Sequence, residues 1–162
     1  METPPDPAAS RPFAAVQLLL AKAGLRPTRQ RLQLARILFA AEPRHVTAEM
    51  LAQEASDGGL KLPLGTVYNA LNAFARAGLL REVAVDGTRT WFDTHTAPHH
   101  HFVDAAGRLS DIPPGAVEIA RLPAAPAGQV IASVELVVRL RRPPRLFLRR
   151  ILRVILRIDL TA

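Results

Sequence analysis

A run of three histidines, His99-His100-His101, has the clearest chemistry in this sequence. Side chains alternate along an extended strand, so His99 and His101 are expected on one face and His100 on the other. Two imidazoles on one face can share a metal ion with ligands from elsewhere in the fold. Adjacent histidines can also supply axial ligands to haem iron, so all three are haem candidates. The spacing leaves metal and haem both open.

A helical segment with one apolar and one polar side is the second feature. Val67, Leu71 and Phe74 lie at i, i+4 and i+7 and should face a core. The opposite side offers groups that hydrogen-bond to base edges and phosphates in the major groove of DNA. These candidate DNA-binding residues are Thr66, Tyr68, Asn69, Asn72 and Arg76. The alternative is a solvated helix face in a small α-rich domain.

Three further helices are predicted before this segment. One covers residues 13–23, and Thr28 and Thr47 are the expected N-caps of the other two. The segment that reads DNA is expected to begin at Thr66 and to end at Gly78, because glycine commonly closes a helix.

A β-hairpin is predicted directly after these helices. Residues 81–85 and 88–92 favour strands, and Asp86-Gly87 between them is a strong hairpin signal. Together with the helices, the hairpin predicts a winged helix-turn-helix. Arg89 lies near the wing tip, where it can reach a minor groove. The candidate phosphate contacts beside the second helix are Arg26, Arg29 and Arg31.

The second half of the chain favours strands. Residues 99–104 and 108–112 are expected to pair around a turn at Gly107, and residues 116–122 to form a short helix. Residues 130–140 read as a long apolar strand that needs cover on both faces. A segment this short cannot bury such a strand alone, so we expect a homodimer. The alternative is an internal core strand.

Composition sets further limits. The sequence has no cysteine, which excludes disulfides, thiol chemistry and a four-cysteine structural zinc site. Residues 1–12 hold four prolines and are expected to form a disordered arm. The start of the chain lacks the pattern of a signal peptide, which favours a cytoplasmic protein.

The net charge of +7 is unevenly distributed. Residues 1–92 carry 11 Lys and Arg against 8 Asp and Glu, a net +3, and residues 93–140 carry 3 against 5, a net −2. The tail, residues 141–162, holds 7 arginines against Asp159, a net +6. The DNA-binding prediction therefore depends on the helix and not on overall charge. The tail resembles a basic amphipathic helix for a membrane surface or a partner, or else it is an irregular extension.

Four motifs resemble the ferric uptake regulator family of metal-responsive repressors, in the family's order and spacing. They are Gly24-Leu-Arg-Pro-Thr-Arg-Gln-Arg31, His45-Val-Thr-Ala-Glu-Met-Leu51, Gly65-Thr-Val-Tyr-Asn-Ala-Leu71 and Ala77-Gly-Leu-Leu80. The chain looks most like the iron response regulator branch, through Thr66-Val-Tyr-Asn69, Trp91-Phe-Asp93, His99-His-His101 and Asp111-Ile-Pro113. That branch is implied to sense haem and to control genes of iron and haem metabolism as a dimer.

The resemblance implies a regulatory metal site. His45 and Asp93 match the family positions that complete such a site with His99 and His101. The site would tie the DNA-binding domain to the dimerisation domain.

The resemblance also shows two departures. His100 and Glu118 correspond to part of a second family site, but Pro98 stands at its other histidine position. The two Cys-x-x-Cys pairs of the family's structural zinc are missing, and so is the N-terminal Cys-Pro haem motif of some iron response regulators. The histidine run is therefore the main haem candidate.

These features predict an α+β protein with a winged helix-turn-helix over residues 13–92 and a small α/β dimerisation and sensing domain over 93–140. We expect a dimeric transcription regulator, not an enzyme, that binds A·T-rich palindromic promoter DNA. Haem or a divalent metal (iron, manganese or zinc) would modulate its affinity. One alternative is a zinc-, manganese- or peroxide-sensing repressor of the same family. The other is a small metal-dependent hydrolase built on His99, His101 and Asp93.

Overall fold

The computed structural model describes residues 13–40, 42–85 and 89–143, and the chain divides into two compact units, Met1–Ala97 and Pro98–Ala162. Asp93 belongs to a strand of the first unit, and the predicted boundary between the domains at residue 93 stays a prediction. The predicted arm, the wing tip and the tail beyond residue 143 lie outside the described residues. None of the described helices is long and apolar enough to cross a membrane.

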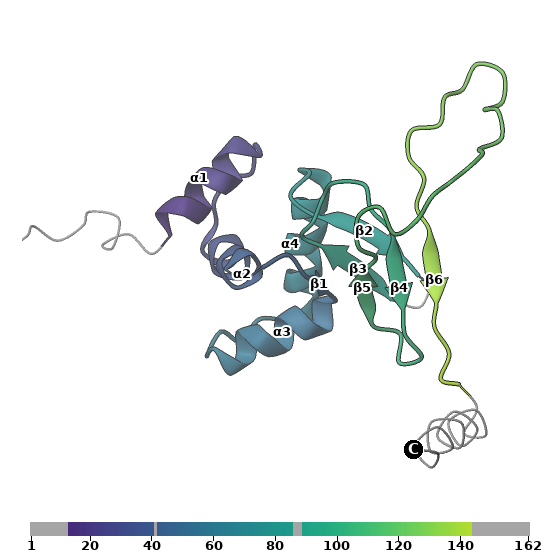
Figure 1. Ribbon diagram of the computed structural model, residues 1–162. Coiled ribbons are helices and arrows are strands. Elements are labelled where there is room, and N and C mark those ends of the chain that lie inside the picture. The colour runs from purple at the N-terminus through teal and green to yellow at the C-terminus, as the bar shows by residue number, and fades with distance from the viewer. Residues whose placement is uncertain (1–12, 41, 86–88, 144–162) are drawn as a thin grey trace, which may run out of the picture. The chain divides into compact units, whose positions relative to one another are not determined.

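The first unit contains four helices and a small sheet (Figure 1). The helices are α1 (Ala14–Lys22), α2 (Arg29–Phe39), α3 (Ala48–Asp57) and α4 (Leu64–Arg76). The strands are β1 (His45–Val46), β2 (Arg81–Ala84) and β3 (Thr90–Asp93), which pair antiparallel in the order β1-β3-β2. Strands β2 and β3 are the arms of the predicted hairpin, which completes the winged helix-turn-helix.

Local signals place the starts of α2 and α3. Thr28 and Thr47 each precede a helix in extended backbone, and their hydroxyl oxygens accept hydrogen bonds from the backbone N–H groups of Arg31 and Met50, both at 3.3 Å. Each bond satisfies a donor that the helix itself cannot pair. Both predicted N-caps are confirmed.

The start of α4 differs from the prediction. The helix begins at Leu64 after Pro63, two residues before Thr66. Pro63 is the N-cap residue, with a φ of −58° and a ψ of 139°, and proline suits this place because it has no N–H to leave unpaired at the start of a helix. The end of α4 is as predicted, because Gly78 adopts a φ of +73° that favours glycine.

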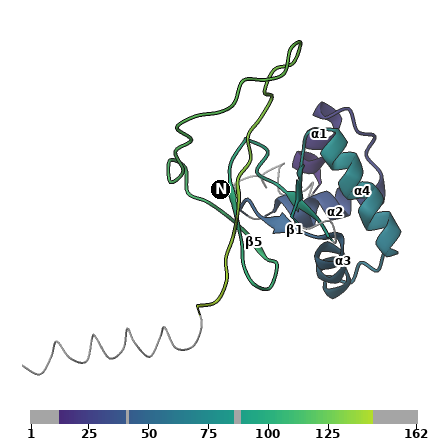
Figure 2. The same ribbon diagram turned by 90° about the vertical axis from the view of Figure 1, so that its right-hand side faces the viewer.

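One apolar core joins α2, α3, α4 and the sheet of the first unit. Figures 1 and 2 both show these three helices gathered together. The predicted inward residues Val67, Leu71 and Phe74 are fully buried. Fully buried side chains from the other elements pack in the same core: Leu34, Leu38, Val46, Leu51 and Phe92. This packing fixes which side of α4 is left for solvent.

The second unit contains a three-stranded sheet of order β5-β4-β6, with β4 (His101–Val103), β5 (Leu109–Asp111) and β6 (Val137–Arg139). Strand β4 pairs antiparallel with β5 and parallel with β6. The predicted strands at 99–104 and 108–112 are confirmed in shorter form.

Two predictions for the second unit are wrong. Residues 116–122 form no helix, and residues 130–140 form a strand only over β6. The first segment is short and exposes Ile119 and Leu122, so no buried apolar face stabilises a helix. The second segment pairs with β4 at only three positions, and Val130 is 88% exposed. Figure 1 shows the chain between β5 and β6 as a long irregular excursion.

Candidate functional site

The outward side of α4 carries the predicted DNA-reading residues. Asn69 and Arg76 are exposed, and Thr66, Tyr68 and Asn72 are half-buried. Because the opposite side of the helix is locked into the core, these side chains share one polar face. The structure therefore brings the five residues together, and their contact with DNA stays a prediction.

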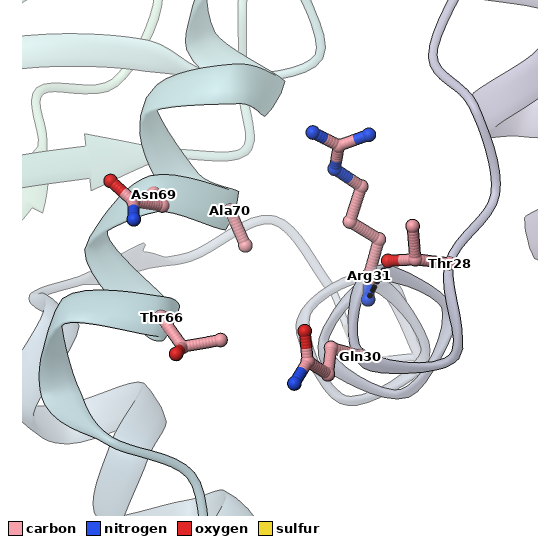
Figure 3. A pocket seen from close by; sticks show the side chains of 6 residues that line it. All are labelled: Thr28, Gln30, Arg31, Thr66, Asn69 and Ala70. Carbon is pink, nitrogen blue, oxygen red and sulfur yellow. Dashed lines mark hydrogen bonds between the residues drawn. The ribbon is translucent and has the colours of Figure 1, made fainter.

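An open polar pocket of about 260 Å³ lies where the start of α2 faces α4 (Figure 3). Its lining residues are Thr28, Gln30, Arg31, Thr66, Asn69 and Ala70. Arg31 Nη1 donates a 3.0 Å hydrogen bond to the carbonyl oxygen of Arg26, which holds the guanidinium near the first turn of α2. Hydroxyl, amide and guanidinium donors at a helix start can serve a phosphate oxygen.

The other predicted basic contacts are accessible. Arg26 and Arg29 are exposed before and at the start of α2, and Arg89 is exposed just before β3. Their roles at phosphates and in a minor groove stay predictions.

Tyr68 has a partner that the sequence analysis did not identify. Its phenol Oη donates a 2.9 Å hydrogen bond to Glu49 Oε1 in the first turn of α3. This bond raises the pKa of Tyr68. The pKa of Glu49 is lowered by hydrogen bonds from its own backbone N–H, from the Thr47 side chain and from Tyr68. No local spacing indicates a contact between residues that are 19 positions apart.

Among the described residues of the first unit, His45 and Asp93 form a pair of metal-ligand side chains. The antiparallel register of β1 and β3 places these residues directly opposite each other. His45 Nε2 lies 3.6 Å from Asp93 Oδ2, and the two side chains are 10% and 1% exposed. Asp93 Oδ1 accepts a 2.8 Å hydrogen bond from the backbone N–H of His95, which orients the carboxylate. The structure therefore places His45 beside Asp93, and the role predicted for them in a regulatory metal site stays a prediction.

Neighbouring residues hold the His45–Asp93 pair in register. The Thr94 hydroxyl accepts a 2.8 Å hydrogen bond from the Arg44 backbone N–H, and the Thr94 N–H donates to the Arg44 carbonyl at 3.1 Å. The Arg44 guanidinium binds both carboxylate oxygens of Glu54 in α3, at 3.0 and 2.8 Å. Bidentate pairing of this kind restricts orientation as well as distance.

The second unit holds the His99–His101–Asp111 cluster. Asp111 Oδ1 lies 3.2 Å from His99 Nε2 and 4.0 Å from His101 Nε2. The two imidazole rings lie side by side with centroids 4.4 Å apart, and the His101 side chain is fully buried. His99 and His101 therefore share one side, as alternation predicted. Asp111 was not predicted as a ligand, and only the β4–β5 register, which pairs it with His101, reveals it.

His100 behaves differently from its two neighbours. Its Nδ1 accepts a 3.2 Å hydrogen bond from the backbone N–H of Leu136, next to β6. Glu118 is exposed in the irregular segment between β5 and β6. The second site predicted for His100 and Glu118 stays a prediction.

The donor types fit a divalent cation. Imidazole nitrogen and carboxylate oxygen suit iron(II), manganese(II) and zinc(II), whereas thiolate ligands are absent because the sequence has no cysteine. One ligand atom from each of His99, His101 and Asp111 lies within 4.8 Å of the other two. Three convergent donors of these types, two of them largely buried, can hold such an ion.

Sequence relatives point to one family. The profile of the Ferric uptake regulator family matches residues 22–137. The chain is similar to the ferric uptake regulation protein of Shigella flexneri, with 39% identity over 82 residues that cover 51% of this chain and 55% of that protein. The chain thus spans about half the length of the curated relatives that it matches.

Solved structures share the fold. The manganese-containing structure of the ferric uptake regulator from Pseudomonas aeruginosa is 25% identical, covers 79% of this chain and 98% of its own, and has a TM-score of 0.59. The Vibrio cholerae ferric uptake regulator is 22% identical, covers 78% and 99%, and has a TM-score of 0.61. The fold of these regulators combines a winged-helix domain with a dimerisation domain. This arrangement agrees with the predicted α+β fold class.

Proposed function

The chain belongs to the ferric uptake regulator family, which consists of transcription regulators and not of enzymes, and we propose that it regulates transcription by binding double-stranded promoter DNA in the cytoplasm. The hydrolase alternative is thereby set aside. The observation that carries the proposal is the combination, in one chain, of a polar α4 face with convergent histidine and carboxylate ligands. A metal ion at those ligands would modulate the affinity for DNA.

The polar face of α4 supports recognition of the major groove. A helix whose apolar side is buried in a small domain can present its other side to base edges. Exposed Asn69 can pair bidentately with adenine, and the pocket between α2 and α4 offers donors to a phosphate. We propose an A·T-rich operator with two-fold symmetry, because a homodimer reads two half-sites related by that symmetry.

A homodimer is supported by the apolar residues that a single copy leaves uncovered in the second unit. They are Ile119, Leu122, Val130, Ile131, Leu136 and Leu140, each at least 40% exposed. Large apolar side chains exposed in such number within one short segment favour an interface. We propose that a second copy covers the segment between β5 and β6.

We propose that the effector is a divalent metal bound by His99, His101 and Asp111. The mixed nitrogen and oxygen donors suit iron, manganese or zinc, and the Pseudomonas aeruginosa relative was solved with manganese. The resemblance adds His45 and Asp93 to the same ion, and this addition stays a prediction. Cysteine-based peroxide or redox sensing has no thiol to use here.

Haem is the alternative effector, as in the iron response regulator branch, and the run of three histidines supports it. A haem group needs an accessible axial imidazole beside an apolar slot. The close packing of His99 and His101 with Asp111 suits a small cation better. His100 is the better haem candidate, because it lies outside the His99–His101–Asp111 set and the backbone N–H of Leu136 orients its ring through Nδ1.

Fluorescence anisotropy with full-length protein tests the effector. The probe is a labelled duplex selected by the wild-type protein from a random-sequence pool in Mn²⁺. We expect Mn²⁺ to strengthen binding by about tenfold or more, as is typical of coupled sites. His99→Ala/His101→Ala should abolish this response. His95→Ala, a histidine outside both ligand sets, is the matched control and should keep it.

The other results of that experiment are equally informative. If haem alone changes the affinity and His100→Ala removes the effect, the haem-sensing alternative replaces the metal. If the double variant responds to Mn²⁺ like the wild type, the proposed ligands are wrong. Asn69→Ala should weaken binding to the selected duplex by about 1–3 kcal/mol, and unchanged affinity would contradict reading by α4.

A further inference from the structure

An anionic side chain lies beside the polar face of α4. Glu49 is exposed in the first turn of α3, and its Oε1 accepts the hydrogen bond from Tyr68 Oη at 2.9 Å. Every phosphate of a bound duplex repels a carboxylate at this place. Glu49 therefore opposes DNA binding through its charge, yet it also holds Tyr68 on the face of α4 proposed to read DNA. The combination of these two effects suggests a role for Glu49.

Glu49 is itself firmly held. It follows the N-cap Thr47, and its carboxylate lies at the start of α3, where the helix dipole favours a negative charge. Its pKa is lowered, first by a hydrogen bond from its own backbone N–H and then by the Thr47 side chain and Tyr68, so it is ionised near neutral pH. The positive charge of Arg89, just before β3, lowers the pKa of Glu49 further.

The contact restricts Tyr68. A phenol has two side-chain torsions, and a charge-assisted hydrogen bond to a fixed carboxylate selects one orientation. Tyr68 is half-buried, so part of its side chain packs on the protein and part stays accessible. Ordering a contact residue before binding lowers the entropy cost of binding.

We propose that Glu49 is a positioning residue that gives this protein its selectivity for DNA sequence, which rests on the proposed DNA-reading role of α4. Its carboxylate holds Tyr68 in the orientation that contacts bases, and its charge lowers the affinity for every duplex, a cost that only a duplex making the Tyr68 contact offsets. One side chain thus orders the contact to the correct site and imposes a cost on every site that lacks this contact. Selectivity commonly needs such a repulsive element.

A purely structural role makes different predictions. An acidic residue in the first turn stabilises a helix, and loss of that stability would lower affinity for every duplex alike. The proposed role requires instead that the Glu49 and Tyr68 substitutions are energetically coupled and that removal of the charge alone favours non-selected DNA.

The test compares the selected duplex with a scrambled duplex of the same length and composition, in Mn²⁺, for Glu49→Ala, Glu49→Gln, Tyr68→Phe and the double variant Glu49→Ala/Tyr68→Phe. The ratio of the affinities for the selected and the scrambled duplex cancels the repulsion that both share. Glu49→Ala and Tyr68→Phe should each lower this ratio by about tenfold, and the double variant no further, because both remove the same contact. Glu49→Gln keeps a hydrogen-bond acceptor but removes the charge, so it should strengthen binding to both duplexes. The gain should be larger for the scrambled duplex, because the neutral amide orders Tyr68 less well and the selected duplex loses part of that contact. Asp57→Asn removes one charge at the other end of α3 and is the matched control.

Two results would overturn the inference. One is a double variant in which the loss of selectivity equals the product of the losses in the two single variants. The other is an equal loss of affinity for both duplexes in Glu49→Ala together with a lower melting temperature. Asn69→Ala separates this from failure of the proposed function. If Asn69→Ala weakens binding to the selected duplex while the Glu49 and Tyr68 variants keep the wild-type ratio, only the inference fails. If Asn69→Ala also binds like the wild type, the reading role of α4 fails.

Discussion

The two units of this chain differ in how many apolar side chains a single copy buries. In the first unit, three helices and a sheet bury Leu34, Leu71, Phe74 and their neighbours completely. In the described part of the second unit, the buried apolar residues are Val103 and Ile112. Since burial of apolar surface is the main stabilising term in folding, the first unit has a core of its own, whereas the described part of the second unit buries little apolar surface.

The same difference appears in the polar side chains. His101 is fully buried in the second unit beside His99 and Asp111. Burial of polar groups costs free energy unless they are paired or coordinate a metal. An ion at the cluster and a second copy over the apolar segment would therefore supply stability that the small sheet lacks. Four substitutions or additions test this contrast, in order of decreasing effect.

Phe74→Ala should destabilise the first unit by about 3–5 kcal/mol, because it leaves a cavity in a fully packed core. Urea unfolding followed by tryptophan fluorescence measures this unit specifically, because Trp91 in β3 is the single tryptophan of the chain. Ile119→Ala, at an exposed apolar residue of the second unit, is the control and should shift this transition little. If Phe74→Ala lowers the free energy of unfolding by less than about 1 kcal/mol, the first unit does not depend on this core for its stability.

Mn²⁺ should stabilise the second unit by about 2.7 kcal/mol at a free concentration 100 times its Kd. Amide hydrogen exchange of β4 and β5 with and without metal measures the effect, which His99→Ala/His101→Ala should remove. The Trp91 transition tells whether the first unit shares the ion. A metal-dependent shift that disappears in His45→Ala would make His45 a ligand, and no shift at all would confine the ion to the second unit.

Ile131→Asp should weaken the proposed homodimer by at least tenfold, equivalent to about 1.4 kcal/mol, because it places a charge in the apolar segment. Sedimentation velocity over a concentration series gives the dimer Kd. Leu18→Asp makes a matched change at an exposed residue of α1 and should leave dimerisation unchanged. An Ile131→Asp protein that dimerises like the wild type would place the interface elsewhere.

Thr28→Ala should cost the first unit about 1 kcal/mol, because the backbone N–H of Arg31 loses its hydroxyl partner. The Trp91 transition again reports the change, and Thr28→Ser keeps the hydroxyl as the control. Equal stability of all three proteins would show that water replaces the cap at no cost.

Features that depend on nearby residues could be predicted from the sequence. The caps at Thr28 and Thr47, the closure of α4 at Gly78 and the buried side of α4 follow from the few neighbouring residues that form each turn. The shared side of His99 and His101 follows from strand geometry alone. The family, with its fold, was also predicted from motifs in the sequence and is confirmed over residues 22–137.

Only the tertiary structure decided the contacts between distant parts of the chain. Asp111 faces His101 because of a strand register, and Glu49 meets Tyr68 because α3 packs against α4. The apolar segment 130–140 was predicted as a strand, but a strand forms only where another strand supplies hydrogen bonds, and β4 supplies them at three positions. Local sequence sets the conformations a segment favours, whereas partners and burial decide which of them the chain adopts.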